Sequence, residues 1–200
     1  MRIQHGRTVI FATLLGTFAL TGAAAARFPF QPESRVWLEG TSTVRDFTCK
    51  ATRLEGTVDP APGQAGLAIG TLQGAVRGGQ VTIPVADLDC GNGTMNGHLR
   101  NALRAADHGS IEFRMSSFDV TPGAPGEGTL RLAGTLRIAG QEKPVTIDGV
   151  AAAEENGALR VRGSKEIVMT EYGVKPPSLM MGTMKVGPRV KVHFDVVLKP

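Results

Sequence analysis

The chain is poor in aromatic residues and in cysteine. Phe, Tyr and Trp together make up 5% of its 200 residues, with a single Trp and a single Tyr, and only Cys49 and Cys90 carry thiols. The lysines and arginines are spread singly along the chain, so the sequence lacks the basic, aromatic-bearing patch of a nucleic-acid-binding domain, and no nucleic-acid partner is expected. The wide spacing of the two cysteines also excludes a catalytic CxxC motif.

Only one long apolar run is present, and it lies at the N-terminus. Basic residues precede an apolar segment at 9–20, and small residues follow it as far as Ala26. This order is typical of a secretory signal peptide cleaved after Ala26. The run is short of the roughly twenty residues that span a bilayer, and an uncleaved N-terminal anchor is the alternative. We therefore expect 1–26 to be removed and 27–200 to function in the periplasm or as a secreted protein.

Residues 27–200 suffice for one domain with its own apolar core. The signal segment contains Arg2 and Arg7 and no acidic residue, so 20 of the 22 Lys and Arg residues remain against 18 Asp and Glu residues. Such a weak positive charge is compatible with transient contact with an anionic membrane surface. The oligomeric state stays open, with a homodimer among the alternatives.

The two cysteines are expected to meet an oxidising compartment after export. Pairing of Cys49 with Cys90 is the natural expectation there. Two separate buried thiols, behaving as small apolar side chains, are the alternative.

Alternation of apolar and polar residues dominates the chain from about residue 35 onward, as in half-buried antiparallel strands. At the C-terminus one phase is wholly apolar and the other polar or charged, and we predict that the apolar phase faces the interior. It consists of Val190, Val192, Phe194, Val196 and Leu198. The segment 130–138 alternates in the same way.

Further strands are predicted at 35–39, 44–58, 67–76, 81–88, 110–120, 145–153 and 159–169. Their connections carry turn residues: the Gly78-Gly79 pair, the Asn156-Gly157 pair and the segment 140–144. Within 110–120 the apolar phase slips by one residue near Ser116, which predicts a β-bulge. Eight or nine strands result.

Two segments depart from this pattern. With Asn92 or Thr94 near the cap, apolar residues recur at helical spacing over 95–106, which predicts one short amphipathic helix. The segment 171–187 is a long loop with Met180, Met181 and Met184, and long loops are uncommon unless functional. Flexible methionines suit variable apolar ligands, although they could equally plug one end of the sheet. About eight antiparallel strands with one apolar face can close as a sandwich or as a barrel.

Four segments of the sequence resemble the YceI-like family, in the same order and over essentially the whole of 27–200. They are GTSTVRDFTC (40–49), MNGHLRNALRAADHGSIEF (95–113), GTLRIAGQEKPVTI (134–147) and TEYGVKPPSLMMGTMKVG (170–187). The resemblance implies an all-β fold, a lipocalin-like antiparallel β-barrel of about eight strands with one short α-helix. It also implies that the barrel holds a polyisoprenoid, isoprenoid quinone or fatty-acyl lipid.

The sequence gives little sign of catalysis. The histidines after the signal segment, His98, His108 and His193, lack metal-binding spacing, and no G-x-S-x-G motif is present. No metal, cofactor or enzymatic activity is therefore expected. A lipid hydrolase using His98 or His108 is the minor alternative, and a structural or partner-binding envelope protein with a filled barrel is the main rival. Polar groups near the mouth, such as Arg45, Glu171 or Lys175, are candidates to contact a lipid head group.

We therefore expect 27–200 to form a YceI-like domain that binds and carries a long-chain apolar lipid. The side chains expected to contact the lipid are apolar and lie on the inward phases of the strands and in the methionine loop. They are Phe113, Leu132, Leu136, Ile138, Met180, Met181, Met184, Val192 and Phe194.

Overall fold

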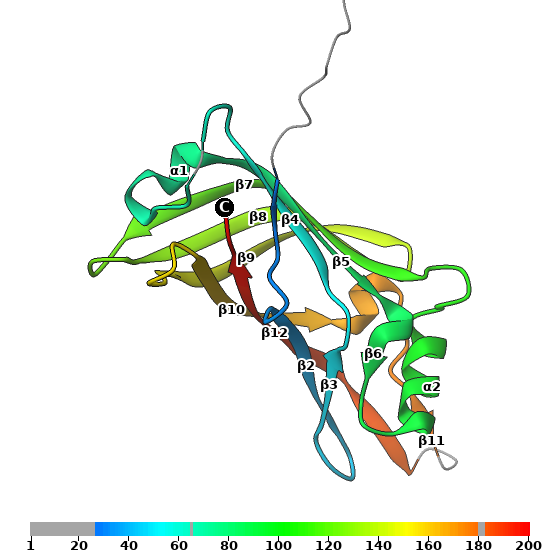
Figure 1. Cartoon of the computed structure of the whole chain (residues 1–200). Helices are drawn as coiled ribbons and strands as arrows, with labels where there is room; N and C mark the ends of the chain where they lie inside the picture. Colours follow the sequence, from blue (N-terminus) through cyan, green and yellow to red (C-terminus); the bar gives the residue numbers. More distant parts are fainter. Residues whose placement is uncertain (1–26, 65, 180–182) are drawn as a thin grey trace, which may run out of the picture.

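The computed structural model describes residues 27–64, 66–179 and 183–200, and it is an all-β fold built from one strongly curled antiparallel sheet (Figure 1). The strands are β1 (Phe28–Pro29), β2 (Arg35–Ser42), β3 (Phe47–Ala51), β4 (Glu55–Pro60), β5 (Val76–Pro84), β6 (Leu88–Asp89), β7 (Ser110–Pro122), β8 (Glu127–Ile138), β9 (Gln141–Ala153), β10 (Leu159–Val168), β11 (Ser178–Leu179) and β12 (Met184–Leu198). The α-helices are α1 (Leu72–Ala75) and α2 (Gly93–Ala102), and 3₁₀ turns form η1 (Ile69–Thr71), η2 (Val85–Asp87) and η3 (Met169–Tyr172).

The strand order is β1-β4-β5-β7-β8-β9-β10-β12-β2-β3-β6, with β11 paired to β12. The two ends of this order come together in one bent antiparallel pair of segments. β3 and β4 follow each other along the chain, and they pair with β6 and β5, respectively. Between the two ladders, the backbone N–H and the hydroxyl of Thr52 donate to the Asp87 carbonyl at 2.8 and 2.9 Å. The sheet therefore curls round and closes on itself.

The barrel-like, all-β fold expected from the sequence is confirmed, with more strand segments than the eight or nine predicted. The excess arises because the predicted strand 44–58 is bent into β3 and β4, and its partner is bent into β5 and β6. When each bent pair is taken as one strand, the wall of the barrel consists of eight long strands among the described residues. β1 and β11 are two-residue additions.

The predicted strand at 67–76 is wrong. This segment forms η1 and α1, which lie across one end of the curled sheet (Figure 1). The buried side chains of Ile69, Leu72 and Ala75 recur every three residues, which is the spacing of a helical turn and not of a strand. The segment therefore covers one end of the interior.

Two predicted connections also differ from the structure. Gly78 and Gly79 lie inside β5, where they pair with Asp59 and Val58, so they do not form a turn. The predicted loop 171–187 is shorter than expected, because η3 extends to Tyr172, β11 occupies 178–179 and β12 begins at Met184.

Other local predictions are confirmed. The pairing of β7 with β8 shifts register between Met115 and Ser117, as the apolar phase slip predicted. The side chain of Asn92 accepts hydrogen bonds from the backbone N–H groups of Thr94 and Met95 and caps α2. The reversal predicted at 140–144 is confirmed in part: the chain turns at Ala139 and Gly140, whose φ angles are 48° and 81°, and β9 already begins at Gln141. A two-residue hairpin turn requires such positive values.

Buried apolar side chains gather at the two ends of the barrel. One cluster includes Leu72 of α1, Leu130 and Leu159, and the other includes Leu103, which follows α2, together with Ile138 and Tyr172. Partly buried apolar side chains on the inner faces of the strands connect the two clusters. Among the described residues, no helix is long and apolar enough to span a membrane.

A disulfide joins Cys49 of β3 to Cys90, which lies just before α2. Their α-carbons are 3.9 Å apart, within the roughly 7 Å that a disulfide requires. The bond therefore links the helix to the part of the wall where the sheet closes.

Replacing Cys49 and Cys90 together by Ser should lower the free energy of unfolding by about 4 kcal/mol, the chain-entropy value for a loop of this length. Guanidinium denaturation of both proteins measures the difference, and the wild type in reductant serves as a control that should match the variant. Two alkylatable thiols in protein purified from its native compartment would contradict the prediction.

Candidate ligand-binding site

The interior of the barrel contains a cavity of about 820 Å³. Pockets that bind small molecules have volumes of roughly 300–1,000 Å³. Each of the eight long strands contributes to its wall, together with α2 and the segment that contains α1. Leucine, isoleucine, valine, phenylalanine and methionine side chains make up most of this wall, so the cavity suits an apolar ligand.

The structure places most of the predicted contact residues on the wall of this cavity. Those that line it are Phe113, Leu132, Leu136, Ile138, Met184, Val192 and Phe194. Met180 and Met181 lie outside the described residues. All five residues of the apolar phase of β12, from Val190 to Leu198, also line the cavity. The predicted register of the last strand is therefore confirmed.

Phenylalanine rings lie against glycines on the cavity wall. A β-carbon added to Gly40 would lie 2.4 Å from the Phe47 ring, and one added to Gly163 would lie 2.5 Å from the Phe194 ring. Gly56 and Phe30 form a similar pair, with a shortest distance of 2.4 Å. Because glycine has no side chain, each ring can lie close to the backbone of the wall. The rings thus cover the backbone and leave the centre of the barrel open.

Replacing Phe194 by Ala should destabilise the protein by less than the roughly 3–5 kcal/mol of a fully packed phenylalanine, because the ring faces an existing cavity. Phe28→Ala is the matched control, since Phe28 is only 4% exposed, belongs to an end cluster and is not among the residues that line the cavity. Urea denaturation of the two variants measures both costs. Equal costs would show that Phe194 is packed on all sides.

The cavity reaches the surface beside the β2–β3 hairpin and the start of α2. Arg45, Asn92 and Thr94 line it and are exposed to solvent. Hydrogen bonds attach the hairpin to the start of β12: Thr43 N–H donates to the Lys185 carbonyl at 3.0 Å, and Lys185 N–H donates to the Thr43 hydroxyl at 3.1 Å. We call this end of the cavity the mouth.

Polar contacts fix the start of α2 at the mouth. The Asn96 side chain accepts from Cys90 N–H at 2.7 Å and donates to the Asp89 carboxylate at 2.9 Å. Asp89 also accepts from Gly91 N–H at 2.9 Å. The hydrogen bond from Asn96, followed by that from Gly91, lowers the pKa of Asp89. The charged carboxylate therefore holds the mouth side of the helix in place.

Of the head-group candidates expected from the sequence, Arg45 lines the cavity at the mouth, whereas Glu171 and Lys175 are not among the lining residues. A cation that was not predicted, Lys165 of β10, also lines it. The signal was present in the sequence, because Lys165 shares the alternating phase of Leu159, Val161 and Ile167.

The single tyrosine is a further polar group in the wall. Tyr172 is buried, with 3% of its surface exposed, and it lines the end of the cavity near η3. Burial, and then the nearby charge of Glu171, raise the pKa of the Tyr172 phenol above its usual value of 10.0. The neutral phenol is therefore the form that the fold favours.

Because Tyr172 is the only tyrosine, its titration can be followed directly by ultraviolet absorbance. The phenolate should appear above pH 10 in the folded protein and near pH 10 in guanidinium. The raised pKa means that this group stabilises the fold below pH 10, and its contribution should be lost as the pH rises through the folded-state pKa. Identical titrations in the two solvents would contradict the burial of the ring.

Among the residues that the structure describes, His98 and His108 have no acidic partner that would suggest a catalytic pair. His98 of α2 lines the cavity, yet in the part of the chain that the structure describes it makes no hydrogen bond or ion pair. His108 lies near Gly140, whose added β-carbon would meet the ring at 2.5 Å. The residues that the structure describes include no group of three His, Cys, Asp or Glu side chains placed to hold a metal ion.

The sequence model of the YceI-like domain family matches residues 30–198 of this chain. The chain belongs to the YceI-like domain family. No curated protein matches the sequence. BcnA of Burkholderia cenocepacia has the same fold, with 18% identity and a TM-score of 0.64 over 83% of this chain and 96% of that one.

Two other solved structures are similar. A polyisoprenoid-binding domain of Saccharophagus degradans, implicated in plant cell wall breakdown, has 13% identity and a TM-score of 0.66 over 88% of this chain and 99% of that one. The YceI protein of Campylobacter jejuni has 17% identity and a TM-score of 0.56 over 76% of this chain and 84% of that one. At these identities the likeness shows the fold.

Proposed function

We propose that the protein binds and carries a long-chain apolar lipid, of the polyisoprenoid, isoprenoid quinone or fatty-acyl type, inside its barrel. The observation that carries the proposal is the apolar cavity of about 820 Å³ bounded by the eight long strands. A filled barrel would have no such space. The structural similarity to a polyisoprenoid-binding domain adds support.

The physical basis of binding is burial of hydrocarbon. Each methylene moved from water into an apolar site contributes about 0.8 kcal/mol, so a long chain gains substantial affinity without any polar contact. Catalysis would require a positioned acid or base beside the chain, and the lining supplies none in a hydrogen-bonded pair among the described residues.

Export is part of the proposal. The signal-like segment at 1–26 supports a carrier that works in the periplasm or outside the cell, where it would take up lipid by transient contact with a membrane surface. Edman sequencing of the protein purified from the periplasmic fraction should begin at Arg27. If the protein is instead found in the membrane fraction with residues 1–26 still attached, it is anchored in the membrane and is not a free carrier.

Native protein extracted with organic solvent should yield an apolar lipid, detected by mass spectrometry. Leu136→Trp should abolish lipid binding, because Leu136 lies on the inner face of β8 and the larger indole ring would occupy the lumen. Thr135→Trp is the matched control, since Thr135 is next to Leu136 on the same strand and points outward. Circular dichroism and thermal melting show whether each variant folds.

Lipid retained by Leu136→Trp, or absent from the wild type with no binding of added isoprenoid or fatty-acyl compounds, would contradict the proposal. In the second case the barrel would act as a structural or partner-binding scaffold.

A further inference from the structure

Lys165 is a cation on an otherwise apolar inner face of β10. The inward residues of this strand are Leu159, Val161, Gly163, Lys165 and Ile167, of which four line the cavity, while the ring of Phe194 lies against Gly163. Lys165 pairs with Val192 of β12, which also lines the cavity. The strand register therefore fixes the direction of this side chain toward the lumen.

The position of Lys165 is part-way along the lumen. On the same strand, Val161 belongs to the apolar cluster at the α1 end, and Ile167 belongs to the cluster at the α2 end. Arg45, the other lysine or arginine on the cavity wall, lies at the mouth and is exposed. Lys165 is thus the inner of two cations on the wall.

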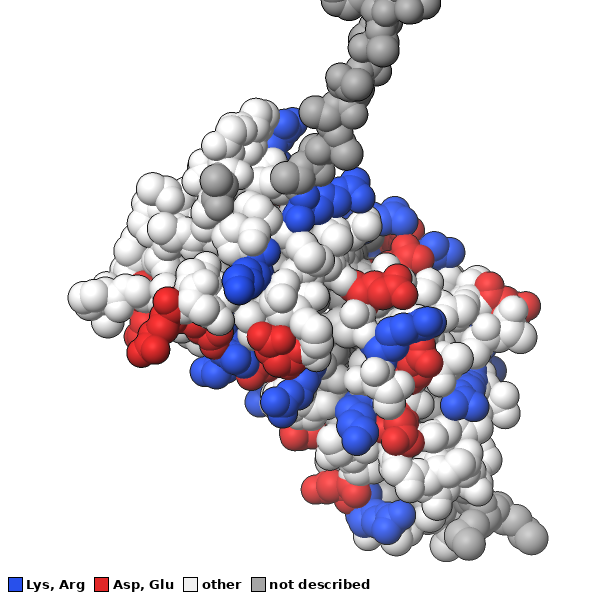
Figure 2. Space-filling view, in the orientation of Figure 1, with Lys and Arg blue, Asp and Glu red and all other residues white. Residues whose placement is uncertain are grey.

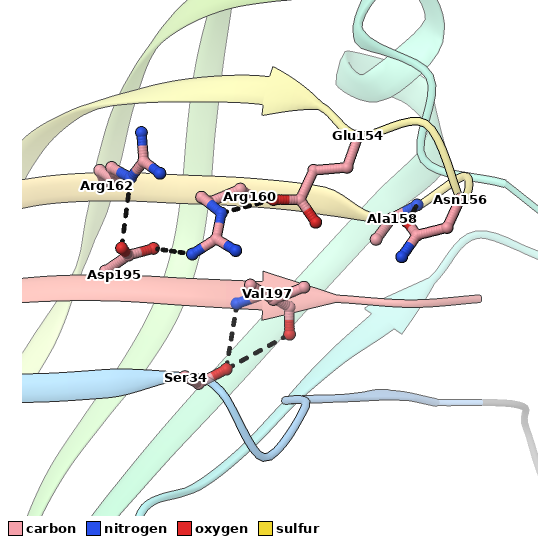
Figure 3. Close-up of polar contacts among 8 residues, drawn as sticks. All are labelled: Ser34, Glu154, Asn156, Ala158, Arg160, Arg162, Asp195 and Val197. Atoms are coloured by element: carbon pink, nitrogen blue, oxygen red, sulfur yellow. Dashed lines mark hydrogen bonds and ion pairs between the residues drawn. The ribbon is translucent and has the colours of Figure 1, made fainter.

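No carboxylate balances these charges inside the barrel. Within the described residues, the wall includes Arg45 and Lys165 and no Asp or Glu side chain. The outer face of the same strand is different: Arg160 and Arg162 bind Asp195 at 2.9 and 3.2 Å (Figure 3). Glu166 on this face pairs with Arg189. Lys165 has no hydrogen-bond or ion-pair partner among the described residues.

The face of the outer surface that Figure 2 shows does not repeat this imbalance. In the view of Figure 2, Lys and Arg side chains alternate with Asp and Glu side chains over the face of the barrel. On this face, the mixture of charges gives no reason to expect a preference for negatively charged ligands.

Filling the cavity changes the surroundings of the Lys165 ammonium. The side chain of Lys165 is half-buried. A hydrocarbon chain in the lumen would displace water from the amine, and an unpaired charge in an apolar site is costly. A negatively charged group at the same place would instead form a charge-assisted hydrogen bond, which is among the stronger polar contacts in proteins.

We propose that Lys165 binds the ionised group of an acidic lipid inside the barrel. This inference rests on the proposed lipid-binding function and adds the substrate class, a hydrocarbon chain with a carboxylate or phosphate group. The acid group lies against the inner wall of β10, and the chain occupies the apolar space next to it. A neutral lipid of the same length binds more weakly.

The inference is tested with delipidated protein and three probes of equal chain length: hexadecanoic acid, hexadecyl phosphate and hexadecan-1-ol. Displacement of the neutral dye N-phenyl-1-naphthylamine measures their affinities. At least one acid should bind the wild type about tenfold or more tightly than the alcohol, the effect of one hydrogen bond to a charged group. The acid that shows the preference identifies the head-group chemistry as carboxylate or phosphate.

The variants assign the effect to a residue. Lys165→Met should abolish the preference while keeping or improving alcohol binding, which also shows that the variant is folded. Lys165→Arg should retain the preference. Arg45→Gln is the matched control at the mouth and should leave most of the preference intact.

Three results would overturn the inference: no acid preference in the wild type, a preference that survives Lys165→Met, or one lost only in Arg45→Gln, which would place the head group at the mouth. Failure of the wild type to bind all three probes would instead contradict the proposed function itself.

Discussion

Closure of the sheet at the bend of two strands is the constraint on which the rest of the molecule depends. The β3–β6 and β4–β5 ladders, joined by the hydrogen bonds from Thr52 to Asp87, connect strands that would otherwise be the edges of an open sheet. A closed sheet has no long unpaired edge, and its two faces become an inside and an outside. The alternation of side chains along every strand then decides what lines the lumen. The disulfide from Cys49 to Cys90 lies at this closure and also attaches α2 to it.

A closed barrel of eight strands is near the size at which side chains fill the interior. This protein keeps space inside by its choice of residues on the inner face. Glycines at positions such as Gly40 and Gly163 let the rings of Phe47 and Phe194 lie close to the wall. The rings shield the backbone from the lumen and supply apolar surface without crossing the centre. The low aromatic content of the sequence is consistent with this arrangement, since few large rings remain to fill the cavity.

The parts of the fold that could be predicted from the sequence are those in which local pattern and tertiary structure agree. The alternation from Val190 to Leu198 in β12 is uninterrupted, and the inner face of this segment is as predicted. The bulge between Met115 and Ser117 could also be predicted, because an extra residue shifts every following side chain to the other face.

Other parts depend on contacts between distant segments. The apolar residues of the segment 67–76 fit both the two-residue period of a strand and the three- to four-residue period of a helix. Packing over the end of the barrel favours the helical conformation. The bend between β3 and β4 follows from closure of the barrel, which a single strand does not reveal. The sequence does not predict Lys165 as a site residue, because its surroundings come from strands that are distant along the chain. A lysine among inward apolar residues suggests a binding site only when the other strands of the wall supply no carboxylate to pair with it.

The lumen combines two contributions that have different consequences for selectivity. Apolar contact supplies affinity in proportion to the hydrocarbon buried, and it distinguishes poorly between chains of similar size. A cation within that surface adds a directional contact that depends on the charge of the ligand. Because Lys165 lies between the two apolar end clusters, occupation by a neutral chain carries a desolvation cost that an acidic lipid avoids. In the proposed binding mode, the same position disfavours a neutral lipid and favours an acidic one, so a single inward side chain would set specificity in a wall that is otherwise mostly apolar.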